Sequence, residues 1–169
     1  DCISWGFSIA ASTLVGQRLG ADDEREATAY GAAILRLSAA TSLVTTAVVF
    51  AVARPIAGVF VEPAELDAAT AFVRVAALSA VALAIKASAT GVLRGAGDTR
   101  IPFYAALLAL YVFALPAAAL GRVTALGVAG LYAALVFEAV VPALVTLWRF
   151  RSGRWLAVSR RYRPPAAGD

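Results

Sequence analysis

Five long apolar segments, separated by short loops, constrain this fold more than any other feature of the sequence. Of 169 residues, 61% are apolar and 15% are charged, and the mean hydropathy is +0.79. A soluble domain has about 25% charged residues and could not bury so much apolar surface, so lipid must surround much of it. Segments of about 20 apolar residues can cross a bilayer as helices. The predicted spans are 3–17, 31–53, 68–93, 101–120 and 125–148, and the first looks shortened at its start.

Helices are the energetically favoured structure for these segments in lipid. A lone helix satisfies its own backbone hydrogen bonds, whereas a lone strand cannot. An alternation of period two is missing, which argues against a barrel. The sequence therefore predicts an all-α polytopic transmembrane bundle over 1–148, followed by a basic, partly disordered tail at 149–169.

Positive charge predicts the orientation of the bundle. With five spans, the loops at 18–30 and 94–102 lie on the same side as the tail. That side carries ten arginines: Arg18, Arg25, Arg94, Arg100, Arg149, Arg151, Arg154, Arg160, Arg161 and Arg163. The other side carries two, Arg54 and Arg122. Because cytoplasmic loops are enriched in Arg and Lys, the tail is predicted to be cytoplasmic. The net charge of +4 is then a topology signal, and nucleic acid is not an expected partner.

Several chemistries are excluded by the residues that the sequence lacks. The chain has no His and one Cys, which removes His-based catalysis, Cys/His metal sites and an internal disulfide. The motifs GxSxG and GxxxxGK[ST] are also absent. The sequence therefore predicts neither an enzyme nor a metal-binding protein.

The motif VGQRLGA at 15–21 ends the first span. Gly16 and Gly20 are four residues apart, a spacing that lets helices approach closely. Gln17 can hydrogen-bond across a helix interface. Helix packing is the predicted role, with a contact to a cytoplasmic gate as the alternative.

The motif LRGAGDTRIP at 93–102 joins the third and fourth spans. Gly95 and Gly97 permit a tight reversal with positive φ. Asp98, with Thr99, can cap the following helix. Arg94 and Arg100 are predicted at the interface, where they can meet lipid phosphates or Asp98. The motif is interpreted as a turn that holds two helices together, or as a latch that breaks when the protein changes conformation.

These two motifs, in this order and with WRFRSGRW at 148–155, resemble the multidrug and toxic compound extrusion (MATE) family of transporters. The resemblance implies twelve helices in two six-helix lobes. The basic tail indicates the second lobe, so the five spans correspond to helices eight to twelve. Because the sequence has no Met, we expect a fragment whose first lobe and helix seven are missing.

Glu138 is the clearest ionisable residue inside a predicted span. Such a residue is a functional candidate by default, since burying a charge in lipid is costly. Pro142 lies four residues later and could free a carbonyl nearby. Glu138 could bind a proton or sodium ion, pair with a cationic compound, or pair with Lys86.

The third span departs from the pattern of the family. The resemblance implies a coupling carboxylate there, but 68–93 contains no Asp or Glu and only Arg74 and Lys86 as charged residues. Coupling could instead reside in the missing first lobe, and sodium and protons both stay open as the coupling ion.

Aromatic residues supply the remaining candidates. Tyr104 and Tyr111 are seven residues apart in the fourth span and share one helical face. They suit a planar organic cation or ordinary helix packing. Trp148 and Trp155 are predicted to anchor the interface.

The resemblance implies a secondary transporter in the cell membrane that exports organic, often cationic, compounds by antiport with sodium ions or protons. Its expected partners are a small organic substrate, membrane lipid and the first lobe, with no cofactor. Two alternatives remain. A lipid-linked saccharide or lipid flippase would prefer a large, cationic central cavity. A non-transporting membrane assembly subunit would lack a polar, solvent-accessible cavity between the two lobes.

Overall fold

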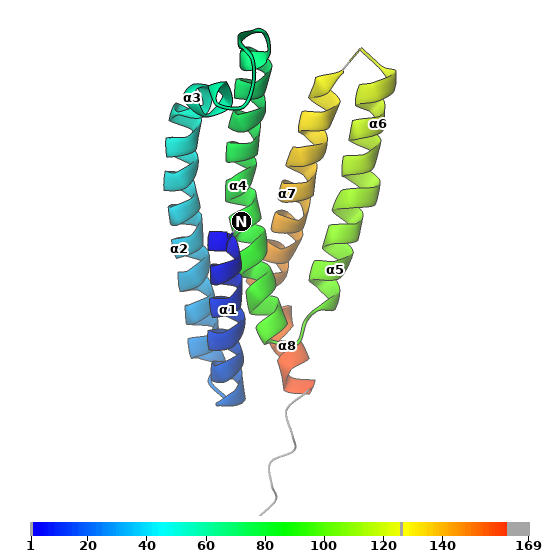
Figure 1. The fold of residues 1–169 in the computed structure, drawn as a ribbon. Helices are drawn as coiled ribbons and strands as arrows, with labels where there is room; N and C mark the ends of the chain where they lie inside the picture. The colour runs from blue at the N-terminus through cyan, green and yellow to red at the C-terminus, as the bar shows by residue number, and fades with distance from the viewer. Residues whose placement is uncertain (1, 126, 162–169) are drawn as a thin grey trace, which may run out of the picture.

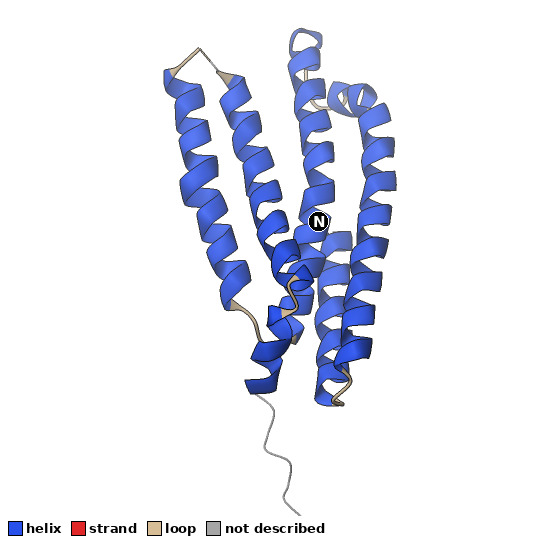
Figure 2. Cartoon of the chain, turned by 180° about the vertical axis from the view of Figure 1, so that it is seen from behind, coloured by secondary structure: helices blue, strands red, loops and turns tan. Residues whose placement is uncertain are grey.

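The computed structural model describes residues 2–125 and 127–161, and the regular structure in these ranges is helical throughout (Figure 2). The elements are α1 (Cys2–Gly20), α2 (Glu24–Ala51), α3 (Ala53–Gly58), η1 (Pro63–Glu65), α4 (Leu66–Gly95), α5 (Arg100–Leu107), η2 (Leu108–Ala114), α6 (Leu115–Val123), α7 (Val128–Arg151) and α8 (Arg154–Arg161). The predicted all-α class is confirmed.

Helix α4 lies at the centre of the bundle. It packs against α1 and α2 on one side and against α7 on the other. Segments α5, η2 and α6 run on as one helical rod beside α7 (Figure 1). The bundle is therefore two groups of helices joined through the contact of α4 with α7.

Four helices of the described chain are long and apolar enough to cross a membrane. They are Glu24–Ala51, Pro63–Gly95, Arg100–Val123 and Val128–Arg151. The first predicted segment also forms a helix, α1, but α1 is not one of these four. It carries Gln17, Arg18 and several serines among its apolar residues.

Glycines bring α1 and α4 into backbone contact. A methyl group on Gly95 would lie 2.6 Å from the Ser12 carbonyl oxygen, and one on Gly91 would collide with the backbone of Ser8. Gly16 faces Gly95, with 3.4 Å between its methyl position and the Gly95 carbonyl oxygen. Gly20 takes no part in this crossing, because no heavy atom of another described element lies within 4 Å of a methyl group placed on it. Gly16 packs instead against a glycine of α4.

The turn after α4 differs from the predicted one. Gly97 has a φ of +80°, so it makes the reversal that the sequence indicates. Gly95 is the last residue of α4 and is required for close helix contact rather than for the turn.

A second glycine crossing joins α6 to α7. A methyl group on Gly121 would lie 2.6 Å from the Gly127 carbonyl oxygen, and one on Gly130 would lie 2.6 Å from the Ala117 carbonyl oxygen. Without side chains at these positions, the two helices meet at the end of the bundle opposite to α8 (Figure 1).

Prolines modify two of the long helices. Pro116 follows the π-helical segment η2, consistent with its lack of an N–H and the clash of its ring with the preceding turn. Pro142 lies inside α7 and cannot donate to the Glu138 carbonyl, four residues earlier, yet the helix continues past it.

The first part of the predicted tail, residues 149–161, is mostly helical. Helix α7 extends to Arg151, and the ring of Trp155 in α8 is fully buried. Its Nε1 donates to the Phe150 carbonyl oxygen at 3.0 Å, and the two rings stack at 5.8 Å. The prediction that Trp155 anchors the interface is therefore wrong, because it belongs to the core, whereas Trp148 is exposed. The expected disorder beyond α8 lies outside the described residues.

An ion pair ties α8 to the start of α2. Arg160 donates to both carboxylate oxygens of Glu24, at 2.7 and 2.6 Å. These hydrogen bonds, and then the charge attraction, raise the pKa of the Arg160 guanidinium above its ordinary value. The pair therefore favours the charged form of the guanidinium.

The Gly95→Ala substitution should destabilise the bundle. The new methyl group would press on the Ser12 backbone, which cannot rotate away, and overpacking of this kind costs about 1–3 kcal/mol. Heating the purified protein in neutral detergent and following the loss of monodisperse protein would measure the effect. Gly20→Ala is the matched control, because its methyl group meets open space. Equal midpoints for the two variants would contradict the proposed crossing.

Candidate functional site

Lys86 occupies the middle of the bundle, in α4. It lines three cavities of about 480, 590 and 630 Å³, which lie between α4 and, respectively, α1, the η2–α7 pair and α5. Its Nζ lies 3.3 Å from Glu138 Oε1 of α7, and 27% of its side chain is exposed. A positive charge within a predicted span is therefore placed where three half-open cavities meet.

Glu138 is paired rather than free. Of the three partners that the sequence left open, the structure shows Lys86, across the contact of α4 with α7. Half of the Glu138 side chain is exposed, towards a cavity whose walls are otherwise mostly apolar. A cation entering this cavity would meet a carboxylate already neutralised by an ammonium group.

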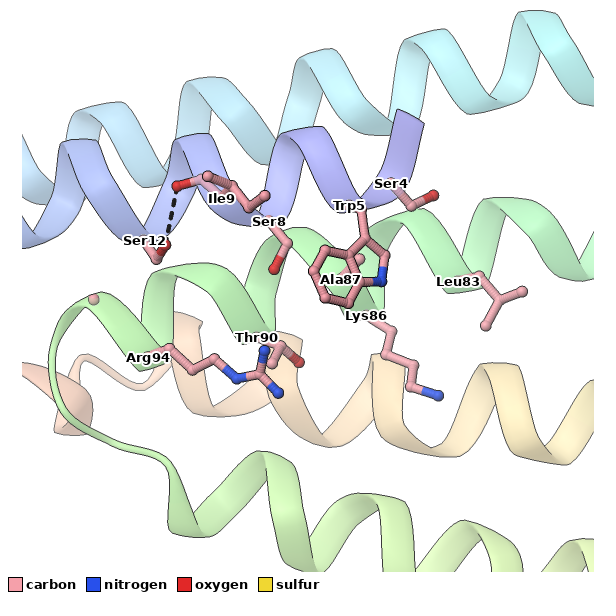
Figure 3. Close-up of a pocket in the computed structure, with 11 residues that line it drawn as sticks. Ser4, Trp5, Ser8, Ile9, Ser12, Leu83, Lys86, Ala87, Thr90 and Arg94 are labelled. Carbon is pink, nitrogen blue, oxygen red and sulfur yellow. Dashed lines mark hydrogen bonds between the residues drawn. The ribbon is translucent and has the colours of Figure 1, made fainter. Parts of the chain in front are cut away.

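The cavity between α1 and α4 is lined by hydroxyl groups and cations (Figure 3). Its polar walls come from two stripes in which residues are four apart, Ser4, Ser8 and Ser12 on α1 and Lys86, Thr90 and Arg94 on α4. A spacing of four places each set on one side of its helix. The indole of Trp5 lies across the same space (Figure 3).

The cavity between α4 and α5 shares the α4 stripe. It is lined by Lys86, Thr90 and Arg94 together with Thr99, Arg100, Pro102, Phe103, Tyr104 and Ala106. Predicted site residues Arg94, Arg100 and Tyr104 are thus brought to one cavity. Tyr111 lies further along the same rod, in η2, and both tyrosines are 62% exposed.

Asp98 has a role different from the predicted helix cap. The α5 helix begins without a side-chain cap, and the carboxylate of Asp98 accepts from Arg149 Nε of α7 at 2.7 Å. Only 5% of the Asp98 side chain and 15% of that of Arg149 are exposed. The predicted partners Arg94 and Arg100 make no ion pair with any described residue. The turn is therefore held to α7 by a buried ion pair.

Gln17 is exposed on α1, and no hydrogen bond from its side chain to another described residue is present. Its predicted bond across a helix interface is not made inside this bundle.

Two features escaped the sequence analysis. Arg149 was assigned to the tail, and nothing local indicates that it reaches a turn 51 residues earlier. The serine stripe of α1, in contrast, is visible in the sequence, because Ser4, Ser8 and Ser12 repeat every four residues in an apolar helix. Such a repeat could have predicted a polar face.

Proteins similar to this chain are known, both by sequence and by structure. The family model described as MatE matches residues 2–120. The chain is 33% identical over 160 residues to a probable multidrug resistance protein NorM of Deinococcus radiodurans, and the match covers 88% of this chain and 36% of that protein. A protein of the same name from Rhodopseudomonas palustris is 30% identical over 154 residues, with 88% and 32% covered.

The fold is also similar to that of a solved protein. The crystal structure of the eukaryotic MATE transporter AtDTX14 superposes with a TM-score of 0.81 at 25% identity, over 95% of this chain and 36% of that one. The chain thus spans about a third of the length of the proteins it matches.

Asp98→Asn should destabilise the protein strongly. It would leave the Arg149 guanidinium buried without its countercharge, and breaking such a pair costs about 3–5 kcal/mol. Thermal unfolding in detergent would measure the loss, and Asp98→Asn with Arg149→Gln should recover part of it. The exposed pair of Arg54 with Asp67 provides the control, because Asp67→Asn should cost less than about 1 kcal/mol. Similar losses for Asp98→Asn and Asp67→Asn would argue against a buried pair.

Proposed function

The chain belongs to the MatE family of multi-pass membrane proteins, and from this premise we propose that it forms part of a secondary transporter that exports organic compounds. Two of its relatives are named probable multidrug resistance proteins, which supports export of drugs as the function. The compounds proposed are organic molecules, often cationic, that move against an inward flow of sodium ions or protons. Because the chain spans about a third of these relatives, the activity is proposed for the complete gene product.

The cavities around α4 are the observation that carries this proposal. Three spaces of several hundred cubic ångströms meet at Lys86, and two of them have walls of hydroxyl, ammonium and guanidinium groups. Sites for small molecules have volumes of about 300–1,000 Å³, with a few polar groups among apolar walls. Spaces of this size and polarity support transport, while a cavity between the two lobes would distinguish a transporter from a non-transporting assembly subunit.

Coupling is proposed to act through Glu138. In the resting pair its charge is balanced by Lys86, 3.3 Å away. A proton or sodium ion that binds the carboxylate would weaken this attraction and release the ammonium group. Because the pair joins α4 to α7, its opening would change how the two helix groups hold together. The same residues would serve either ion, so imposed gradients of each must distinguish them.

The proposed location is the cell membrane, with the carboxyl end in the cytoplasm. The ends of α1 and α4 and the helix α8 lie at one end of the bundle (Figure 1), which gathers most of the arginines there. An Arg-rich end favours the cytoplasm.

Cells that express the complete gene product should accumulate less ethidium than control cells. The reason is outward transport of an organic cation driven by an inward ion gradient. Fluorescence of loaded cells would follow the efflux, with sodium and proton gradients imposed separately. Absence of gradient-dependent efflux across a broad panel of compounds would refute the proposed function.

Glu138→Gln should reduce transport without reducing the amount of protein in the membrane. The amide keeps the shape of the side chain but has no negative charge. It can therefore neither form an ion pair with Lys86 nor bind a coupling cation in place of that pair. The initial rate of efflux, normalised to expression, would measure the loss, which we expect to be tenfold or greater. The matched control is Glu62→Gln, because Glu62 is an exposed residue of the loop between α3 and α4. Equal rates for the Glu138 variant and the unmodified protein would leave Glu138 with a structural role.

A further inference from the structure

We propose that Lys86, Thr90 and Arg94 of α4, together with Arg100 of α5, form a binding site for a phosphate or carboxylate group of an organic anion or amphiphile. We call these four residues the basic face. They line the cavity between α4 and α5, and the first three also line the cavity between α1 and α4. The site shares Lys86 with the proposed coupling pair, whose carboxylate, Glu138, lines a third cavity and neither of these two.

The geometry of α4 places three of the four residues together. Positions 86, 90 and 94 are four apart, so their side chains follow one side of the helix over about 12 Å. Figure 3 shows Lys86, Thr90 and Arg94 projecting from that side. Arg100 begins α5 just beyond the turn and borders the same cavity. The basic face therefore runs from the middle of the bundle towards the end where α8 lies.

The charge of the basic face is unbalanced. No carboxylate lines either of its two cavities among the described residues. Glu138 can neutralise only Lys86, while Arg94 and Arg100 have no acidic partner within the described ranges. Four other arginines of the described chain have an acidic partner, since Arg18, Arg54, Arg149 and Arg160 pair with Glu26, Asp67, Asp98 and Glu24. Both arginines are exposed, so an anion can reach their guanidinium groups and balance their charge.

The surroundings suit the head of an organic anion. Guanidinium groups bind phosphate and carboxylate oxygens through paired hydrogen bonds. The hydroxyls of Thr90 and Ser8 form no hydrogen bond within the described chain, so both can donate to such oxygens. The rings of Trp5 and Tyr104 border the two cavities and offer flat apolar surface to the rest of the molecule. Volumes of about 480 and 630 Å³ exceed the need of a bare inorganic ion.

Two kinds of molecule carry a phosphate or carboxylate group that this site could bind. The anion can be the headgroup of a bilayer lipid such as phosphatidylglycerol, or a soluble organic anion that the protein carries. Binding at equilibrium needs no ion gradient, so it can be measured whether or not the complete gene product transports ethidium.

The test compares the complete gene product with its Arg94→Gln/Arg100→Gln variant in neutral detergent. Neither arginine has an ion pair in the described bundle, so this change breaks no described salt bridge. Arg122→Gln is the matched control, since Arg122 is an exposed arginine at the end of α6 far from α8 (Figure 1). The probes are phosphatidylglycerol, phosphatidylcholine and carboxyfluorescein, with thermal stabilisation for the lipids and fluorescence anisotropy for the dye.

We expect at least one of the two anionic probes to bind, with an affinity at least tenfold lower in the double variant and unchanged in Arg122→Gln. Binding of phosphatidylglycerol alone would identify a bilayer lipid, and binding of carboxyfluorescein would identify a carried anion. The proposal is overturned if neither anionic probe binds, if phosphatidylcholine stabilises the protein as well as phosphatidylglycerol does, or if the double variant binds like the unmodified protein. A double variant that does not fold would be replaced by Arg94→Lys, which keeps the charge but not the paired hydrogen bonds and should bind more weakly.

Discussion

Close backbone contact between α1 and α4 is the constraint on which the rest of the structure depends. Helices in lipid gain little from burying apolar surface against one another, so they associate through tight van der Waals packing at small residues. Gly16, Gly91 and Gly95 supply this packing. The carbonyl oxygens of α1 occupy the space that side chains at positions 91 and 95 of α4 would need. With α1 held there, the opposite side of α4 is left to pack on α7.

The end of α4 then organises one end of the bundle. The reversal at Gly97 brings Asp98 to Arg149, and α8 continues from α7 to bury Trp155 beside α1 and α2. These contacts connect both helix groups through α4, α7 and α8. At the opposite end the α6–α7 pair is held by its own glycines. A transporter that changes shape needs such locally rigid pairs, because motion then concentrates in the contacts between them.

Charged groups that border the cavities belong to two kinds of surface. Glu138 and Lys86 form a pair between α4 and α7, as a coupling element would require. The remaining cations of α4 and α5 face cavities without a carboxylate in the described chain. The sequence associated a large cationic cavity with carriers of lipid-linked saccharides or lipids. The cationic cavity between α4 and α5 is the basis for the proposed binding of anionic groups.

The sequence alone determined the helical class, the approximate limits of the long helices and the family, because hydropathy and turn motifs are local properties of the chain. It also identified Glu138, Asp98 and Gly97 as special positions. It could not determine which groups meet, since the partners of Asp98 and Glu138 are 51 and 52 residues away. Only the tertiary structure decided that Gly95 serves packing, that Trp155 is core, and that Lys86, Thr90 and Arg94 border shared cavities. The physical reason is that rotation of a helix about its axis is set by close contact with its neighbours, which a span length does not specify.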